Sequence, residues 1–287
     1  MKPNLSVAYP GFRLGRGLGG RRYGHTLLEL VIALAIGVLV TGGASALYRT
    51  ARASCDAATD WAAIGDAGQA ALDLLGWQVR LAGLWLRADG AQPNVQTARA
   101  MRQVQLLPVF GCAAGRPAGP AAAPYCEADP GGNDGVQLMY LADPVASWAD
   151  SQGAATDCLG QALPTGGLAV ARFFTRVNSG SGEPELYCDG SGRLGNAQPL
   201  VEGVESLRVQ YWLDGVDQAQ RTVGADQWPH VRGLMLCLVV RGRPGSSSAP
   251  YLDCDGNLVR GSDGRRRQVF HWVLALRNHR ESGDVVH

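Results

Sequence analysis

Residues 24–40 read GHTLLELVIALAIGVLV, and this stretch decides the fold. It opens an apolar run from Leu30 to Leu47 that carries no charged side chain. A helix of that length extends over about 27 Å, and the hydrocarbon layer of a bilayer is about 30 Å thick. The run is therefore predicted to be a membrane-spanning helix near the N-terminus.

The residues ahead of this run are basic. The first 24 residues contain no acidic side chain and five basic ones: Lys2, Arg13, Arg16, Arg21 and Arg22. A basic flank before an apolar segment favours an N-terminus that stays in the cytoplasm, with the rest of the chain exported. The sequence ASALY at 44–48 also has the small residues of a signal-peptidase site, so an ordinary secretory signal is an alternative.

One carboxylate, Glu29, stands at the start of the apolar run. A charge at the centre of a bilayer costs on the order of 2.5–3.5 kcal/mol, and less near the interface. Glu29 either marks the interfacial start of the helix or has a function. Its neighbours favour a function, because Gly24 lies five residues before it and follows Arg21 and Arg22.

The basic leader, Gly24, Glu29 and the apolar helix together resemble the type IV prepilin signal. In that family a dedicated peptidase cuts after the glycine, the new N-terminal residue is N-methylated, and the fifth mature residue is glutamate. The resemblance implies cleavage between Gly24 and His25 and methylation of His25. His25 stands where the family usually has phenylalanine.

The resemblance also implies a role for Glu29 in assembly. Cleavage creates an α-amino group whose ordinary pKa is about 7.7–8, so it is largely cationic at neutral pH. In the family, the glutamate pairs with the N-terminal amine of an adjacent subunit. An unpaired charge in a low-dielectric environment is penalised, so Glu29 would select the register of assembly.

The helix is predicted to continue beyond the apolar run, from about His25 to about Leu84, because no proline occurs between Tyr48 and Pro93. We expect residues 25–48 to form the transmembrane and filament-core half and 49–87 an amphipathic half, after a leader of residues 1–24. Five glycines are expected to weaken the helix and favour bends: Gly42, Gly43, Gly65, Gly68 and Gly76. One face of the second half has apolar residues at three- and four-residue steps: Trp61, Ile64, Ala67, Ala71, Leu74, Leu75 and Val79.

The remainder, residues 88–287, is predicted to be a globular β-rich head. A stretch rich in Pro, Gly and Ala from about Arg87 to Gly135 is interpreted as a loop. Strand-like runs punctuated by Asp-Gly turns follow it: Val136–Leu141, Leu168–Val177, Glu185–Cys188, Val204–Leu213, Val231–Arg241 and Gln268–Leu276. A long N-terminal α-helix packed on an antiparallel β-sheet gives an α+β fold.

Several stretches of the head resemble the PilW-type minor pilins: DCLG at 157–160, LYCDGSG at 186–192, QPLVEGVESLRVQYWLD at 198–214, WPHVRGLMLCLVVR at 228–241 and FHWVLALRN at 270–278. The resemblance implies a type IV pilin-like fold and a structural subunit that helps to initiate and assemble a type IV pilus. It implies as partners other major and minor pilins, the prepilin peptidase, the inner-membrane assembly platform and the membrane itself. The pseudopilins of type II secretion share this architecture and are an alternative.

The implied location is the inner membrane, with a single pass, a cytoplasmic N-terminus and a periplasmic head, and then the pilus at the cell surface. Seven cysteines without a CxxC pair fit disulfides formed in an oxidising compartment. We expect sequential pairing with Cys55 left over, each bridge adding about 2–4 kcal/mol: Cys112–Cys126, Cys158–Cys188 and Cys237–Cys254.

Signatures of catalysis and of cofactor binding are weak. The sequence contains no HExxH or GxSxG motif, and the glycines at 15–24 follow no strand, so we expect no catalytic residue and no cofactor. Asp253, Asp255 and Asn257 place oxygen ligands at alternate positions, which makes them a weak calcium candidate. An Asp-Gly hairpin turn explains them better, so we expect no metal.

Nucleic acid is not an expected partner. The net charge is +1, and Arg265, Arg266 and Arg267 form a short basic run that fits a solvated turn. An alternative from another class is a secreted or membrane-anchored, disulfide-bonded binding protein or enzyme with an ordinary signal or anchor.

Overall fold

A computed structural model describes Gly24 and residues 26–84, 93, 95–103, 106–245 and 249–278, with the backbone alone for 100–103. The chain divides into two compact units at the boundary between Ser54 and Cys55. The first unit consists, in its described part, of the beginning of helix α1, which runs from Leu27 to Leu81. The predicted long N-terminal helix is confirmed, a few residues shorter at each end.

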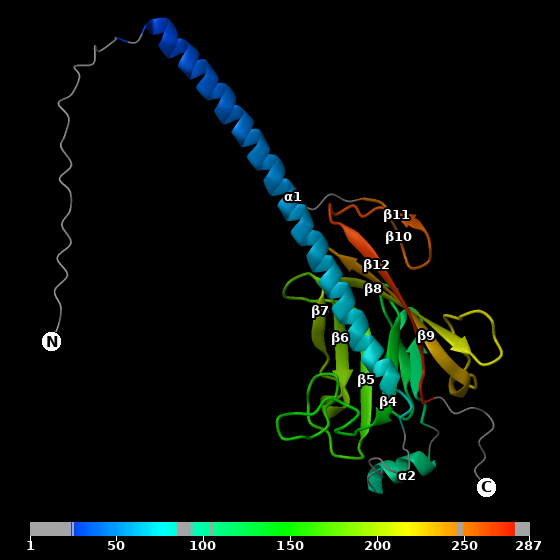
Figure 1. Cartoon of the computed structure of the whole chain (residues 1–287). Helices are drawn as coiled ribbons and strands as arrows, with labels where there is room; N and C mark the ends of the chain where they lie inside the picture. Colours follow the sequence, from blue (N-terminus) through cyan, green and yellow to red (C-terminus); the bar gives the residue numbers. More distant parts are fainter. Residues whose placement is uncertain are drawn as a thin grey trace, which may run out of the picture. The chain divides into compact units, whose positions relative to one another are not determined.

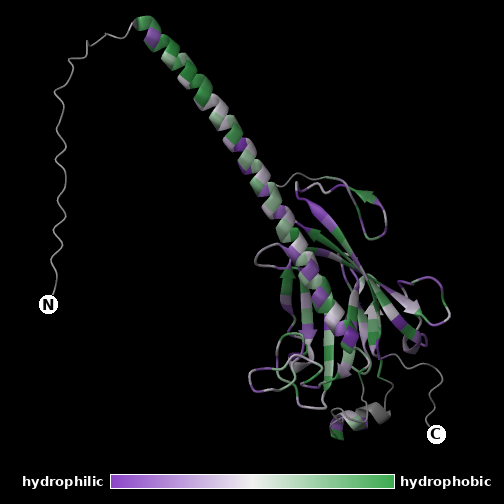
Figure 2. Cartoon of the chain, in the orientation of Figure 1, coloured by the Kyte–Doolittle hydropathy of each residue, from purple (hydrophilic) through white to green (hydrophobic). Residues whose placement is uncertain are grey.

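From Leu30 to Leu47 α1 carries no charged side chain and is exposed, and the beginning of this helix is mostly green in Figure 2. Among the described residues α1 is the one helix long and apolar enough to cross a membrane. Its hydroxyl groups bond back to its own carbonyls: Thr41 Oγ1 donates to Gly37 O at 2.8 Å and Thr50 Oγ1 to Ala46 O at 3.0 Å. These donors are therefore satisfied without water, as a bilayer requires.

The second half of α1 packs on the head through one face, which includes Ile64, Ala71, Leu75 and Val79. These residues recur at three- and four-residue steps, so their side chains lie on one stripe of the helix. The helix is continuous through all five of its glycines that the sequence marks as weak points.

Two of those glycines provide space for aromatic side chains of strand β12 (Arg267–Ala275). A Cβ on Gly68 would lie 2.4 Å from the Phe270 ring, and one on Gly76 would lie 2.5 Å from the Trp272 ring. At these two positions the aromatic rings approach so closely that only glycine fits. The sequence alone does not reveal this contact.

The head contains two main antiparallel sheets, and all of their strands except β1 are labelled in Figure 1. The five-stranded sheet has the order β1-β4-β5-β6-β7: β1 Val109–Cys112, β4 Gly135–Leu141, β5 Leu168–Val177, β6 Pro184–Gly190 and β7 Gln198–Glu202. The three-stranded sheet has the order β12-β9-β8, with β8 at Val204–Leu213 and β9 at Val231–Arg241. The α+β fold is thus confirmed.

One hydrophobic core joins the buried stripe of α1 to both sheets; its members include Leu75, Phe173, Leu186, Leu207 and Leu236. Because this core combines the helix with both sheets, the 55–81 part of α1 is an integral part of the head unit.

The prediction of a loop from Arg87 to Gly135 is wrong in its described part. This region contains helix α2 (Val95–Gln103), β1 and the hairpin of β2 (Gly115–Ala118) with β3 (Tyr125–Ala128). Each of these strands has four residues, and β1 and β2 contain glycine, so they lack the alternation that marks a strand in a sequence. A second hairpin, of β10 (Tyr251–Leu252) with β11 (Leu258–Val259), and 3₁₀ turns at Ser191–Arg193 and Trp228–His230 complete the head.

Three disulfides close within the head: Cys112–Cys126, Cys158–Cys188 and Cys237–Cys254. Cys55 is exposed on α1 and unpaired. Each bridge holds a loop or short hairpin onto a strand of one of the two main sheets.

Candidate assembly segment and its anchorage in the head

The start of α1 is capped by Thr26. Its carbonyl accepts the N–H of Leu30 at 3.2 Å, and its side-chain Oγ1 accepts the N–H of Glu29 at 3.2 Å. Thr26 therefore occupies the N-cap position, and Glu29 lies at the third helical position. The sequence analysis missed Thr26, although a threonine three residues before a glutamate and ahead of an apolar run is the signature of a capping box.

Glu29 lies in the first turn of α1, where unpaired backbone N–H groups make the helix end electropositive. A carboxylate there is favoured, and it can accept hydrogen bonds from a cation beside the helix end. Gly24 is exposed, with no atom within 4 Å of the position that a Cβ would take. His25, the predicted first mature residue, lies outside the described residues.

The junction between α1 and the head is built around Asp60. This carboxylate is buried, its Oδ1 accepts the N–H of Arg243 at 2.8 Å, and its Oδ2 lies 3.6 Å from Arg266 Nη1. The Arg266 guanidinium also donates to Ala57 O at 3.3 Å and lies over the Trp61 ring at 4.6 Å. One arginine of the head thus holds a full turn of the helix.

The other end of the packed part of α1 is held by Asn278. Its side-chain Nδ2 donates to the carbonyls of Arg80 and Ala82 at 3.1 and 3.2 Å, satisfying groups that a helix end leaves unpaired. Arg80 in turn lies over the Trp272 ring at 5.3 Å. Because Arg266 and Asn278 flank β12, this strand runs beside α1 and in the same direction.

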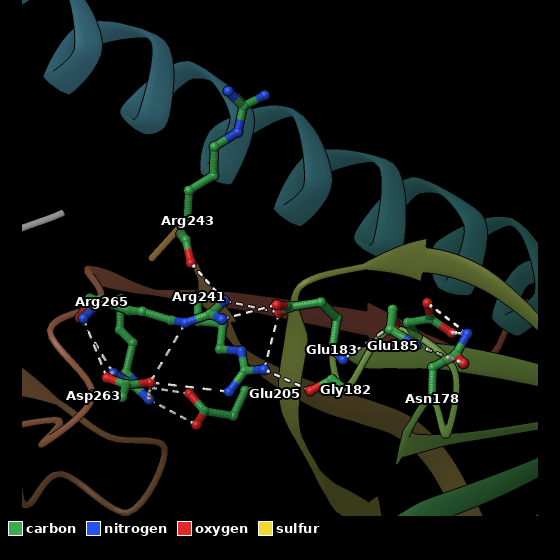
Figure 3. Close-up of polar contacts among 12 residues, drawn as sticks. Asn178, Gly182, Glu183, Glu185, Glu205, Arg241, Arg243, Asp263 and Arg265 are labelled. Atoms are coloured by element: carbon green, nitrogen blue, oxygen red, sulfur yellow. Dashed lines mark hydrogen bonds and ion pairs between the residues drawn. The ribbon is translucent and has the colours of Figure 1, made fainter. Parts of the chain in front are cut away.

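A network of ion pairs supports the junction, and Figure 3 shows its members pointing toward one another. Glu183 accepts hydrogen bonds from Arg265 at 2.8 Å and from Arg241 at 2.9 Å. Arg265, and secondly Arg241, lower the pKa of the Glu183 carboxyl below its ordinary value. The basic run is therefore not merely a solvated turn, as the sequence suggested.

The third arginine of that run, Arg267, binds two carboxylates. Its guanidinium contacts Glu205 at 2.5 and 2.9 Å and Asp263 at 2.8 and 2.9 Å. Arg267 holds the pKa of Asp263 well below its usual range. With these charges compensated within the chain, the run does not present a cationic patch of the kind that binds phosphates.

The weak calcium candidate forms the turn between β10 and β11. Asp253 Oδ1 accepts the backbone N–H groups of Asp255 at 2.9 Å and Asn257 at 2.8 Å, and Gly256 has φ +80°. Asp255 also lies 3.7 Å from Arg208. In the part of the chain that the structure describes, no three His, Cys, Asp or Glu side chains gather to hold a metal ion.

Comparison with known proteins yields matches at both ends of the chain. Residues 172–278 match the family model of the type IV pilus-assembly protein W, and residues 20–45 match that of the prokaryotic N-terminal methylation motif. A search of curated proteins finds no match. Among solved structures, a type IV-like pilin, TTHA1219 from Thermus thermophilus, is similar with 16% identity and a TM-score of 0.39; the match covers 76% of this chain and 97% of that one.

The assignment rests on the two family models, which match separate parts of the chain. The methylation motif spans Gly24, the capped start of α1 and Glu29. The assembly-protein model spans β6 to β9, β12 and most of β5. Both families point to a structural protein that is anchored in a membrane, processed by a prepilin peptidase and associated with other pilins. The two models, over residues 20–45 and 172–278, together support a type IV minor pilin of the PilW type.

Proposed function

We propose that this chain is inserted in the inner membrane with its basic leader in the cytoplasm and its head in the periplasm. The prepilin peptidase cuts it between Gly24 and His25, and His25 is methylated. The mature chain then joins other major and minor pilins on the inner-membrane assembly platform and helps to initiate a type IV pilus at the cell surface. It carries no catalytic residue of its own.

The observation that supports this proposal most strongly is the exposed apolar half of α1 with a carboxylate in its first turn. Apolar residues such as Leu27, Leu34 and Leu39 are 81%, 61% and 75% exposed. A surface of this kind is stable only in lipid or against other apolar helices. When the subunit leaves the membrane and joins the filament core, this surface passes from contact with lipid to contact with other apolar helices.

Glu29 would determine the register in which neighbouring helices pack in the filament. Cleavage after Gly24 would free an amine four residues before Glu29, and the amine of a neighbouring subunit would supply the cation for this carboxylate. A charge pair in an apolar surrounding is favourable only when both partners are present, so a mismatched register leaves two unpaired charges.

The first experiment determines the mature N-terminus by mass spectrometry of the membrane-extracted chain. A start at His25, with or without one methyl group, is the expected result, and Gly24→Ser should leave the leader attached. Gly20→Ser, which changes a leader glycine away from the cut, is the matched control and should be processed. A start near Tyr48 would instead support the secretory signal and overturn the proposal.

The second experiment tests Glu29 after processing has been established. Glu29→Gln keeps the size of the side chain and removes its charge, and it should be exported and cut but poorly incorporated into sheared pili. Asp66→Asn, at an exposed position of the same helix, is the matched control. Incorporation of Glu29→Gln at the level of the unaltered chain would refute the pairing role.

A further inference from the structure

Strand β12 forms an open edge of the three-stranded sheet. β9 pairs with all nine of its residues, from Arg267 to Ala275, without a register shift. On its other side, no strand in the described part of the chain pairs with it. β12 therefore presents one long side to its surroundings.

The hydrogen bonds at the two ends of β12 show which backbone groups face outward. Leu276 N–H donates to Arg232 O at 2.8 Å, and Arg266 O accepts Gly242 N–H at 2.8 Å. In an antiparallel pair, alternate residues bond to the neighbour, so the even-numbered residues between these ends bond to β9. The odd-numbered residues direct N–H and C=O to the open side: Arg267, Val269, His271, Val273 and Ala275.

The two edges of the other sheet are protected in ways that β12 is not. β1 has four residues, and β7 has five, contains Pro199, and shifts register against β6 between Leu186 and Tyr187. Shortness, proline and bulges are the devices by which proteins prevent pairing at an edge. β12 has none of them. The one charged side chain among its outward residues is Arg267, at the first position of the strand, where Glu205 and Asp263 bind its guanidinium. Val273, near the other end, is 60% exposed.

We propose that the open edge of β12 receives a β-strand from the head of a neighbouring pilin of a different kind. The sheet would then continue from one subunit to the next. A row of outward N–H and C=O groups is complementary to an extended strand, whose own backbone supplies the matching acceptors and donors. The inference rests on the proposed function, because it requires this chain to stand beside another pilin.

The direction of β12 argues against a second copy of the same edge as the partner. Two identical edges pair antiparallel about a two-fold axis across the strands, and this axis also reverses one helix relative to the other. Because β12 runs in the same direction as residues 57–82 of α1, such a pair would contain antiparallel helices. Subunits inserted in one membrane in the same orientation have parallel helices, so the antiparallel partner strand must come from another surface.

The test compares three variants of the full chain in the cells that assemble it. Val273→Pro removes an outward N–H and leaves the bonds to β9, since proline is tolerated on the open side of an edge strand. Val273→Ala keeps this N–H and shortens the side chain. Glu202→Pro makes the same backbone change on the edge strand β7. There the N–H of Gly203 donates to Pro184 O at 2.8 Å, so the N–H of the preceding residue, Glu202, faces outward.

The readout is the share of mature, disulfide-bonded chain found in sheared pili. Val273→Pro should reduce this share roughly ten-fold, the size expected for losing one hydrogen bond and the close approach of the strand, whereas the other two variants should stay within about two-fold. Equal incorporation of Val273→Pro and the unaltered chain would overturn the inference. Absence of the unaltered chain from pili would instead overturn the proposed function.

A photo-crosslinking amino acid at position 273 then identifies the partner. The expected adduct joins position 273 to a strand in the head of a different pilin, and the same amino acid at position 202 should not give it. An adduct to β12 of a second copy, an adduct to a protein that is not a pilin, or no adduct in assembled pili would overturn the inference.

Discussion

Replacing Gly76 by alanine tests whether the glycines of α1 are points of weakness or points of contact. Gly76 is buried under the Trp272 ring, whereas Gly65, three turns earlier on the same helix, has no atom within 4 Å of the position of an added Cβ. The two substitutions therefore make the same chemical change in the same helix and differ in what the new methyl group meets.

The two effects of the substitution have opposite signs. Alanine stabilises a helix interior by about 1 kcal/mol relative to glycine. At Gly65 this gain should be obtained almost in full. At Gly76 the new Cβ would lie 2.5 and 2.8 Å from two Trp272 carbons, and forcing an extra methyl group into a packed site costs about 1–3 kcal/mol. The net change at Gly76 should therefore be a destabilisation of up to about 2 kcal/mol.

Thermal unfolding of the oxidised head unit, residues 55–287, measures this difference. For a unit of this size 1 kcal/mol shifts Tm by roughly 2–4 °C, so Gly65→Ala should unfold a few degrees above Gly76→Ala. Gly68→Ala, whose Cβ would meet Phe270 at 2.4 Å, should behave like Gly76→Ala. If Gly76→Ala raises Tm as much as Gly65→Ala does, Gly76 is not needed to make room for the Trp272 ring and the reasoning is wrong.

Three further outcomes are expected in the same unfolding assay. Asp60→Ala removes the acceptor of the Arg243 N–H and should lower the unfolding free energy by about 1–3 kcal/mol, whereas an unchanged Tm would contradict the anchoring role. Tyr211→Phe removes a buried hydroxyl for which the described residues offer no partner, so the unfolding free energy should stay level or rise by up to about 1 kcal/mol; a clear fall would show that the hydroxyl is satisfied. The lowered pKa values of Glu183 and Asp263 stabilise the fold above the ordinary carboxyl range, so Tm should fall as the pH drops through and below pH 4, and a flat profile would contradict this.

The parts of the fold that could be predicted are those with a regular pattern. The alternation in Val204–Leu213 and the apolar run within Val231–Arg241 mark strands whose observed bounds are the predicted ones. The absence of proline and the spacing of apolar residues likewise mark α1. β7 was missed because it is half exposed and contains Pro199, and β2 because GRPA has no period at all.

The candidate assembly segment could be recognised because its residues lie within a few positions of one another. Gly24 and Glu29 form a local signal, and Thr26 would have been found by the same inspection. The open edge of β12 could not be predicted, because Gln268–Leu276 has the same pattern as an interior strand. Which strand lies at an edge depends on the order of strands in the sheet, which only the structure supplies.

The order of the disulfides has a consequence for the export that we propose. The three bridges span 14, 30 and 17 residues, and no bridged stretch overlaps another along the chain. A chain that crosses a membrane from its N-terminal side delivers both cysteines of one bridge before the first cysteine of the next. When the second cysteine of a bridge emerges, the nearest cysteine along the chain that is still reduced is its correct partner. Vectorial delivery can thus guide correct oxidation without a reshuffling step, even before the filament subunit has completed its sheets.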